Sequence, residues 1–352
     1  MTDIETAPLN LARETVTARF IDPAGRPVER EVEIRNNPIT GRKARVTKSR
    51  IHECEPGTET LPEPPPDAEQ TETCPFCPPR VRSRTPRLIP EIAASGRLVQ
   101  GRSILFPNLF PYGPYSAVSL FDDQHYVPIG TASPATYADG FINAGEYLRR
   151  VRACDPAAVY LAVTQNHLPS AGGSLVHPHL QIQADEIPAN HHRFLRRRTT
   201  GYARALNGRL FADLVLAEWS AGARYIGATG PWEWLAAHAP EGFFELWGIY
   251  PGATSITDLS ADDWGDLAEG VVNAQRFYRS LCRNGYNLGL LSVETPDSVL
   301  ELRCVIQVRS NYAPWVRNDH TGFEVMLGEM ATFTDPEETA RLARPFWSAR
   351  SG

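Results

Sequence analysis

The segment Ser174-Leu-Val-His177-Pro-His179-Leu-Gln181 constrains this chain more than any other stretch. We expect it to form an extended strand, in which successive side chains alternate between the two faces. His177, His179 and Gln181 would then point to one face, while the apolar residues between them pack in a core. A neutral imidazole held beside an amide and the glycine-rich turn Ala171-Gly-Gly-Ser174 is able to attack a phosphate. A buried histidine pair with purely structural hydrogen bonds is the alternative.

A second cluster of possible metal ligands begins upstream, at Cys74-Pro-Phe-Cys77. A Cys-x-x-Cys motif places two thiolates on one tight knuckle, at the bite that tetrahedral zinc accepts. No second Cys-x-x-Cys follows, so we expect the other ligands to be histidines: His125 is one candidate, and His177 or His179 would complete the set. A redox Cys-x-x-Cys is the competing interpretation. The prolines around the cysteines favour metal, because a thioredoxin-like motif should open a helix.

Four short blocks of sequence occur in a fixed order. They are Asn37-Pro-Ile-Thr-Gly41 with Arg50 downstream, Cys74-Pro-Phe-Cys77, Phe106-Pro-Asn108-Leu-Phe-Pro111, and His177-Pro-His179-Leu-Gln181 preceded by Asn166 and Gly173-Ser174. With these blocks the chain resembles a galactose-1-phosphate uridylyltransferase-like protein of the histidine-triad superfamily. The resemblance covers nearly the whole chain beyond residue 35, and the His-Pro-His-x-Gln motif with its upstream Cys-x-x-Cys is the most specific part.

The resemblance implies catalytic roles for His179 and Gln181. His179 aligns with a nucleophile that attacks the α-phosphorus of a nucleoside diphosphate sugar and holds the nucleotide covalently. The family fixes the tautomer of this histidine with a main-chain carbonyl. Gln181 aligns with the glutamine of the transferases, where the hydrolases of the superfamily carry a third histidine. A neutral amide donates to a phosphoryl oxygen but delivers no proton, so transfer is favoured over hydrolysis.

The resemblance also implies a metal site and a substrate site. One structural zinc ion would be bound by Cys74, Cys77, His125 and His177. The two phosphates and the nucleoside of the substrate would be bound by Arg50, Asn108, Asn166, Gly173 and Ser174. A homodimer is implied as well.

Three departures from the family pattern bear on the substrate. Leu109 stands where the well-known bacterial enzymes have a carboxylate, so a ribose acceptor is lost. Glu53 replaces a second phosphate-binding arginine, and Arg303-Cys-Val305 replaces the His-x-His pair of a second metal site. We therefore expect that second metal site to be absent, and the sugar and the base stay open.

The function expected from these residues is nucleotidylyl transfer. A nucleoside monophosphate, UMP in the first place, would move between a nucleoside diphosphate sugar and a sugar 1-phosphate or another phosphate acceptor. One alternative is a phosphorylase of an adenine nucleotide sugar, with inorganic phosphate as the acceptor. Another is a non-catalytic, zinc-stabilised nucleotide-binding protein.

The order of apolar patterns suggests two copies of an α+β unit that share one sheet. The resemblance implies the same α+β fold, with tandem histidine-triad-like halves that share an antiparallel sheet flanked by helices. We place an N-terminal hairpin in residues 1–35, a catalytic half in 36–200 and a second, degenerate half in 201–352. The first half is expected to hold strands near 103–106, 117–121, 159–164 and 176–183, with a helix at 134–153. The second half repeats this order with strands near 242–250, 286–292 and 299–308 and a helix at 261–284.

Charge and apolar content exclude some partners. The 352 residues carry a formal net charge of −6, which gives no electrostatic case for nucleic acid. The start of the chain lacks the pattern of a signal peptide, and no apolar run reaches the roughly 20 residues that span a bilayer. We therefore expect no membrane association and a cytoplasmic protein, where the knuckle thiols stay reduced.

Overall fold

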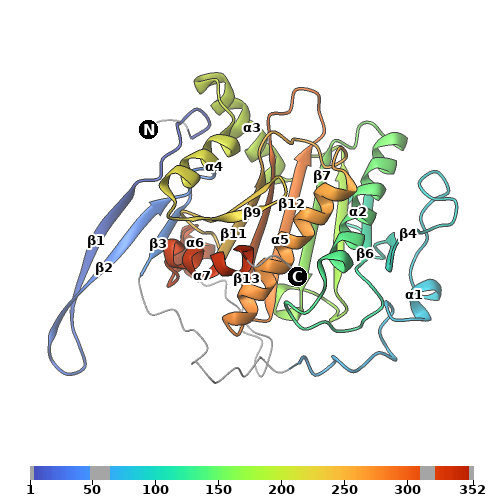
Figure 1. Ribbon diagram of the computed structural model, residues 1–352, viewed down its shortest axis with the longest axis horizontal. Helices are drawn as coiled ribbons and strands as arrows, with labels where there is room; N and C mark the ends of the chain where they lie inside the picture. The colour runs from blue at the N-terminus through green and yellow to red at the C-terminus, as the bar shows by residue number, and fades with distance from the viewer. Residues whose placement is uncertain (1–3, 48–63, 310–321, 349–352) are drawn as a thin grey trace.

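A ten-stranded antiparallel sheet runs through the protein and carries the residues of interest (Figure 1). The computed structural model describes residues 4–47, 64–309 and 322–348. The strands of this sheet are, in chain order, β4 (Leu98–Gln100), β5 (Ser103–Pro107), β6 (Tyr115–Leu120), β7 (Tyr160–His167), β8 (His179–Asp185), β9 (Tyr225–Thr229), β10 (Trp232–Ala236), β11 (Phe243–Tyr250), β12 (Gly285–Val293) and β13 (Leu302–Arg309). In space they follow the order β4-β5-β6-β8-β7-β12-β13-β11-β10-β9.

The sheet consists of two copies of one unit. Each unit has three strands, a long helix and two further strands: β4-β5-β6-α2-β7-β8 and then β9-β10-β11-α5-β12-β13, with α2 at Pro134–Cys154 and α5 at Ala261–Ser280. The units meet at the centre, where β7 and β12 pair from Tyr160 opposite Val293 to His167 opposite Tyr286. This arrangement confirms the predicted α+β fold with tandem halves that share one sheet. The domain boundaries at residues 35 and 200 stay predictions.

The two long helices lie side by side over one face of the sheet, and their sequences explain where they begin. Ser133 caps α2 by accepting from the Thr136 N–H, and Ser260 with Asp263 forms a capping box at the start of α5. Between the helices, a Cβ on Gly145 would lie 2.7 Å from the indole nitrogen of Trp264, so only glycine permits this close approach. We expected α5 to continue to residue 284, but it ends at Ser280.

The opposite face of the sheet is covered differently in the two halves. Over the second half lie α3 (Asn190–Leu206) and α4 (Leu210–Ala221), whose apolar side chains pack against Trp247 and Ile249 of β11. Over the first half lies the Cys74–Cys77 segment, followed by the single turn α1 (Arg80–Ser83). Because strand side chains alternate, each strand buries one set of residues under α2 and α5 and presents the other set to this second face.

The N-terminal residues form a smaller sheet at one side. It consists of β1 (Arg13–Ile21), β2 (Pro27–Asn36), β3 (Lys43–Val46) and β14 (Met330–Thr332), in that order. The first two strands make the hairpin that the alternating sequence predicted, and the hairpin projects from the body of the molecule (Figure 1). Two helices complete the described chain, α6 (Gly322–Leu327) and α7 (Pro336–Ser348). Among the described helices, none combines the length and the apolar character needed to cross a bilayer.

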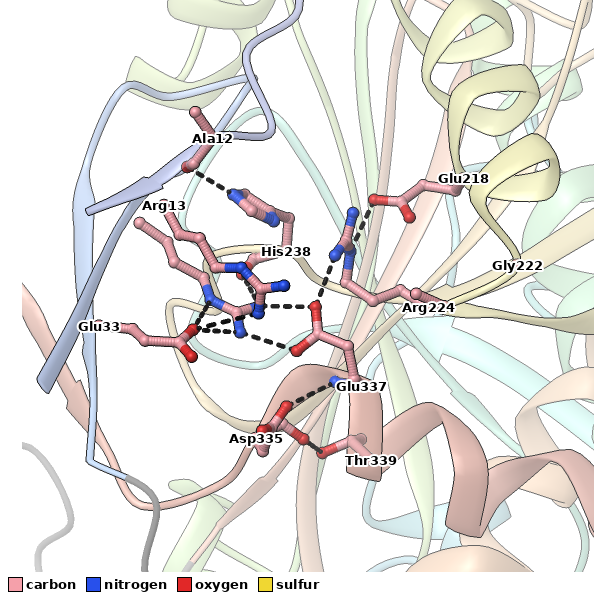
Figure 2. A network of polar contacts seen from close by, with 12 residues as sticks. Ala12, Arg13, Glu33, Glu218, Gly222, Arg224, His238, Asp335, Glu337 and Thr339 are labelled. Atoms are coloured by element: carbon pink, nitrogen blue, oxygen red, sulfur yellow. Dashed lines mark hydrogen bonds and ion pairs between the residues drawn. The ribbon is translucent and has the colours of Figure 1, made fainter. Parts of the chain in front are cut away.

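A buried ion-pair network fastens the smaller sheet to the second half (Figure 2). The guanidinium of Arg35, on β2, is fully buried and lies 2.6 Å from a Glu33 carboxylate oxygen and 2.7 Å from one of Glu337, on α7. Arg224 then joins Glu337 to Glu218 of α4, with N–O distances of 2.6 and 2.9 Å. Since each buried charge has an opposite partner, the network holds three separate elements in one arrangement.

Candidate active site and metal centre

The segment from Ser174 to Gln181 is not one continuous strand, which corrects our expectation. Strand β8 begins only at His179, and the residues before it form turns that follow the 3-10 turn η1 (Pro169–Ala171). Pro178 lacks the N–H that a strand residue donates to its neighbour, so the pairing with β6 stops at His179 opposite Leu120. His177 therefore leaves the sheet, and the two histidines have different surroundings.

The four predicted metal ligands lie together. The ligand atoms of Cys74, Cys77, His125 and His177 all lie within 4.8 Å of one another. The Cys77 sulfur is 3.3 Å from Nδ1 of His125 and 3.6 Å from Nδ1 of His177. Metal–ligand bonds of about 2.0–2.3 Å give a tetrahedron with edges of roughly 3.3–3.8 Å. The spacing and the donor set therefore fit a zinc ion, although other thiophilic metals share these preferences.

Hydrogen bonds on the outer ring nitrogens prepare both histidines to bind a cation. Nε2 of His125 lies 2.9 Å from the main-chain oxygen of Asp67, and Nε2 of His177 lies 3.1 Å from that of Asp122. A carbonyl accepts only, so Nε2 carries the proton in each ring, and the Nδ1 lone pair faces the cysteines. Burial lowers the pKa of His177 to about 4, which keeps this ring neutral. Within the described residues, no other group of three or more histidine, cysteine or acidic side chains is arranged for a metal.

His179 is not one of these four ligands, and one of its ring nitrogens has no partner among the described residues. Its Nδ1 lies 2.8 Å from the main-chain oxygen of His177, so Nδ1 donates the hydrogen bond. The proton is then fixed on Nδ1, and Nε2 keeps its lone pair, with no acceptor or donor for it among the described residues. The side chain is 6% exposed, and burial lowers its pKa. The geometry holds a neutral imidazole whose nucleophilic nitrogen is available.

Phe76 connects the metal cluster to His179. It is the second of the two residues between the cysteines. Its ring lies edge-on to the rings of His177 and His179, with centroid distances of 6.0 and 5.3 Å. Its other neighbour is Phe106 of β5, at 5.2 Å. We did not single out Phe76 from the sequence. The only signal was a large apolar residue inside a Cys-x-x-Cys, which is ordinary in a knuckle that packs on a core.

Gln181, predicted to be catalytic, and Asn108, predicted to bind the nucleoside, both lie in the first half of the large sheet. Gln181 follows His179 on the same face of β8 and pairs with Thr164 of β7 and Val118 of β6. Asn108 follows β5, toward the other end of β8, and its side-chain oxygen accepts from the N–H of Phe110. His179 and the part of β8 nearest Asn108 are about four residues apart along the strand, or roughly 13 Å at strand spacing. Arg50 and Glu53 lie outside the described residues.

The predicted phosphate-binding residues surround the turn that leads into β8. A Cβ on Gly173 would lie 3.0 Å from the main-chain oxygens of Asn166 and Leu168, so a side chain there would displace this turn. Ser174, next in the chain, is exposed. The side-chain oxygen of Asn166 accepts from Nδ2 of Asn287, on β12, at 2.6 Å. Asn287 belongs to the second half, and only the pairing of β7 with β12 brings it here.

Comparison with known proteins agrees with the architecture. No family model matches the sequence. A curated protein of Archaeoglobus fulgidus, described only as uncharacterized, is 28% identical over 341 residues, which cover 96% of this chain and 98% of that protein. Among solved structures, an ADP-glucose phosphorylase from Arabidopsis thaliana with bound ADP-glucose superposes with a TM-score of 0.68 at 19% identity, covering 89% of this chain and 98% of that one.

Two further solved structures agree. A GalT-like protein from Arabidopsis thaliana gives a TM-score of 0.66 at 18% identity, covering 88% of this chain and 98% of that one. A uridylyltransferase gives a TM-score of 0.64 at 20% identity, covering 90% of this chain and 98% of that one. At these identities the similarity concerns the fold. This chain therefore has the fold of the galactose-1-phosphate uridylyltransferase-like proteins, as its motifs predicted.

Proposed function

We propose that this protein is a nucleotidylyltransferase that works through a covalent nucleotidyl-His179 intermediate. The observation that carries the proposal is the hydrogen bond from Nδ1 of His179 to the main-chain oxygen of His177, at 2.8 Å. It makes Nε2 the nucleophilic nitrogen and aims a neutral ring from the start of β8, next to the Gly173 turn. Buried His192 and His238 also leave one ring nitrogen without a partner. The position of His179 beside the Gly173 turn and two residues before Gln181 therefore supports the catalytic role together with its free Nε2.

In the first half-reaction, the Nε2 lone pair of His179 attacks the α-phosphorus of a nucleoside diphosphate sugar. A P–N bond forms, and the bond from the α-phosphorus to the bridging oxygen breaks, so that a sugar 1-phosphate leaves. This leaving group is a phosphate, which departs without taking a proton. Gln181, two residues along the same face, would donate its amide N–H to a phosphoryl oxygen as charge builds there.

In the second half-reaction, a phosphate oxygen of the acceptor attacks the same phosphorus and the P–N bond breaks. Gln181 cannot take a proton from water, because a neutral amide is not a base at ordinary pH. The intermediate should therefore wait for a phosphate acceptor, which is a sugar 1-phosphate in the proposed reaction.

The base is proposed to be uracil, with adenine as the second candidate. A nucleoside bound at His179 would extend along β8 toward Asn108, over the rough distance that a nucleoside monophosphate spans. The residue after Asn108 is Leu109, whose side chain is 64% exposed and offers no acceptor to a ribose hydroxyl. Because an exposed leucine at this position does not select one base, the label-transfer experiment also tests phosphorolysis of an adenine nucleotide sugar.

The metal is proposed to be one zinc ion with a structural role. Four protein ligands, Cys74, Cys77, His125 and His177, leave no open position for substrate. The ion would fix Phe76 and the turn before β8, and thereby the ring of His179. We further propose that the protein acts as a homodimer in the cytoplasm. Exposed apolar side chains on the hairpin, Phe20 and Ile21, and on α6, Met326 and Leu327, support self-association.

The proposal is tested by label transfer. The protein is incubated with UDP-glucose or ADP-glucose labelled at the α-phosphorus, denatured, and assayed for acid-sensitive label on the protein. We expect label with one of the two donors and none with His179→Gly. His192→Asn, a change at another buried histidine, is the matched control and should label normally. Equal labelling of His179→Gly would contradict the proposal, and tight nucleotide binding without label would favour the non-catalytic alternative.

A further inference from the structure

A cavity of about 640 Å³ lies on the second half of the large sheet, away from His179 and Gln181. Its floor is formed by residues of β11, β12 and β13 that face away from α2 and α5, and its walls come from β3, α3, α4 and α6. The volume lies within the range of small-molecule sites. By topology β13 is the counterpart of β8, so this cavity occupies in the second half the sheet face that His179 occupies in the first.

Arg303 is the central polar group of the cavity. Its guanidinium carbon lies 4.7 Å from the ring centre of Trp247 and 5.2 Å from that of Phe211. The two aromatic rings hold the planar group by cation–π contact and leave its in-plane N–H donors free. Among the described residues, no carboxylate or carbonyl accepts a hydrogen bond from Arg303. A clamped guanidinium with unused donors is ready to bind a planar or tetrahedral oxyanion.

The carboxylates of the lining are already occupied by other donors. Glu301 accepts from the main-chain N–H groups of Phe211, Ala212 and Gly252, and Glu324 accepts from that of Ala331. Glu245 accepts from the Trp247 indole and the Glu241 N–H. Glu241 accepts from Thr40 and Arg42, and Glu329 accepts from Arg45. Burial also raises the pKa of Glu245 to about 7, so this side chain repels an anion less than an ordinary carboxylate. The lining has five carboxylates against three cations, and the charges of Glu245 and Glu241 act on Arg303. Affinity for an oxyanion therefore rests on the unused N–H donors of Arg303 and on Lys43, and not on the net charge of the lining.

Lys43 adds a second cation to the same cavity. It lies on β3 and lines the wall, and the described residues include no acidic partner for its ammonium group. Apolar side chains, among them Leu291 and Val305, form the rest of the floor. A ligand that fits would carry an oxyanion at one end and a less polar body at the other.

We propose that this second cavity binds a small oxyanion-bearing molecule, held by in-plane hydrogen bonds from Arg303 and by the charge of Lys43. Phosphate esters and carboxylates share the required chemistry, because both present two oxygens to the guanidinium fork. This cavity adjoins the proposed active site through Asn287, which lines it and donates to Asn166. Binding at Arg303 does not depend on the reaction at His179.

Binding is measured by titration calorimetry with three probes: inorganic phosphate, glucose 1-phosphate and succinate. We expect about one equivalent of at least one probe to bind at this cavity. Loss of a charge-assisted, bidentate contact should weaken that binding at least about tenfold in Arg303→Met. Lys43→Met should weaken it several-fold, while Arg19→Met, an exposed arginine on the hairpin, should leave it unchanged.

The variants also separate this site from the first half. Binding of the probe should persist in His179→Gly. A probe bound beside His179 would instead keep its full affinity in Arg303→Met, and that result would overturn the proposal. Absence of binding by all three probes overturns it as well. If Arg303→Met does not fold, as judged by its thermal transition, the exposed Lys43→Met variant decides: unchanged affinity there contradicts the proposal.

Discussion

The ring of Phe76 lies edge-on to the ring of His179, with the two centroids 5.3 Å apart and the planes at 78°. Phe76 is also one of the two residues between Cys74 and Cys77, so a movement of this Cys-x-x-Cys segment moves the ring that contacts the histidine. The contact gives the metal cluster a physical means of positioning a side chain that is not one of its ligands. Four predictions test this view of the site and of the scaffold behind it.

Replacing Phe76 with alanine should slow nucleotidylation of His179 while leaving the metal bound. The ring would lose one wall of its cage, and small displacements of a reacting atom are costly, so we expect a loss of about tenfold or more. Single-turnover labelling and metal content are measured together. Phe333→Ala, at a side chain that is 57% exposed, is the matched control. An unchanged labelling rate would show that the contact does not position the histidine.

Removing one thiolate should release the metal and lower stability. For Cys74→Ser we expect the zinc content to fall from about one equivalent to well below it, with a lower melting temperature, because ion binding is coupled to folding. Cys154→Ser, at an exposed free cysteine, should change neither quantity. Elemental analysis and a thermal melt measure both. A full equivalent of zinc in Cys74→Ser would mean that the ion binds elsewhere.

Gln181 should control how much of the intermediate is lost to water. Initial rates at several fixed co-substrate concentrations should give the parallel lines of a ping-pong reaction. Gln181→His should raise release of the nucleoside monophosphate without acceptor, because an imidazole can exchange protons with water. Gln183→His, the next residue on the same face of β8, should not. Intersecting lines together with rapid release by the unmodified protein would favour hydrolysis over transfer.

The ion-pair network around Glu337 should make stability depend on pH on the acid side. Burial alone would raise the pKa of Glu337, but hydrogen bonds from Arg35 and Arg224 and the charge of Arg35 hold it well below its ordinary value. The folded pKa is therefore lower than the unfolded one. The contribution is complete above the unfolded value of about 4.3 and is lost as the pH falls further toward the folded value.

Glu337→Gln should accordingly reduce the free energy of unfolding by about 2 kcal/mol at neutral pH, since it removes the carboxylate that Arg35 and Arg224 share and leaves each with one counter-charge, Glu33 or Glu218. Its stability should also change less than that of the unmodified protein between pH 5 and 3, as the unfolded carboxyl titrates there. Denaturant melts measure both effects, with the neighbouring Glu338→Gln as control. Equal acid sensitivity of Glu337→Gln and the unmodified protein would contradict the role of the network.

Local patterns predicted much of the architecture. The apolar spacing of residues 134–153 and the repeat of strands and helix in the second half led to the tandem sheet, and the motifs led to four residues that the structure does bring together. The predicted start of β8 was wrong, because we gave more weight to the alternating pattern around His177 and His179 than to the missing N–H of Pro178. A residue that fits the alternating pattern of a strand still needs a backbone N–H to form the hydrogen bonds between strands.

Other features depend on contacts between distant parts of the chain. Asn287 meets Asn166 only because β12 pairs with β7, and Arg35 meets Glu337 across 302 residues of sequence. The clamp of Arg303 between Trp247 and Phe211 needs α4 to lie over β11 and β13. No local periodicity encodes such partners, since they follow from the tertiary fold and from which charges it buries.

The most direct test of the central claim is the mass of the protein after it meets its donor. Intact-protein mass spectrometry, after incubation with UDP-glucose or ADP-glucose and no acceptor, should show a species heavier by one nucleoside monophosphate. Peptide mapping under alkaline conditions should place the added mass on His179, and a phosphate acceptor should remove it. An adduct on another residue, or turnover of the donor by a protein that lacks His179, would contradict the account.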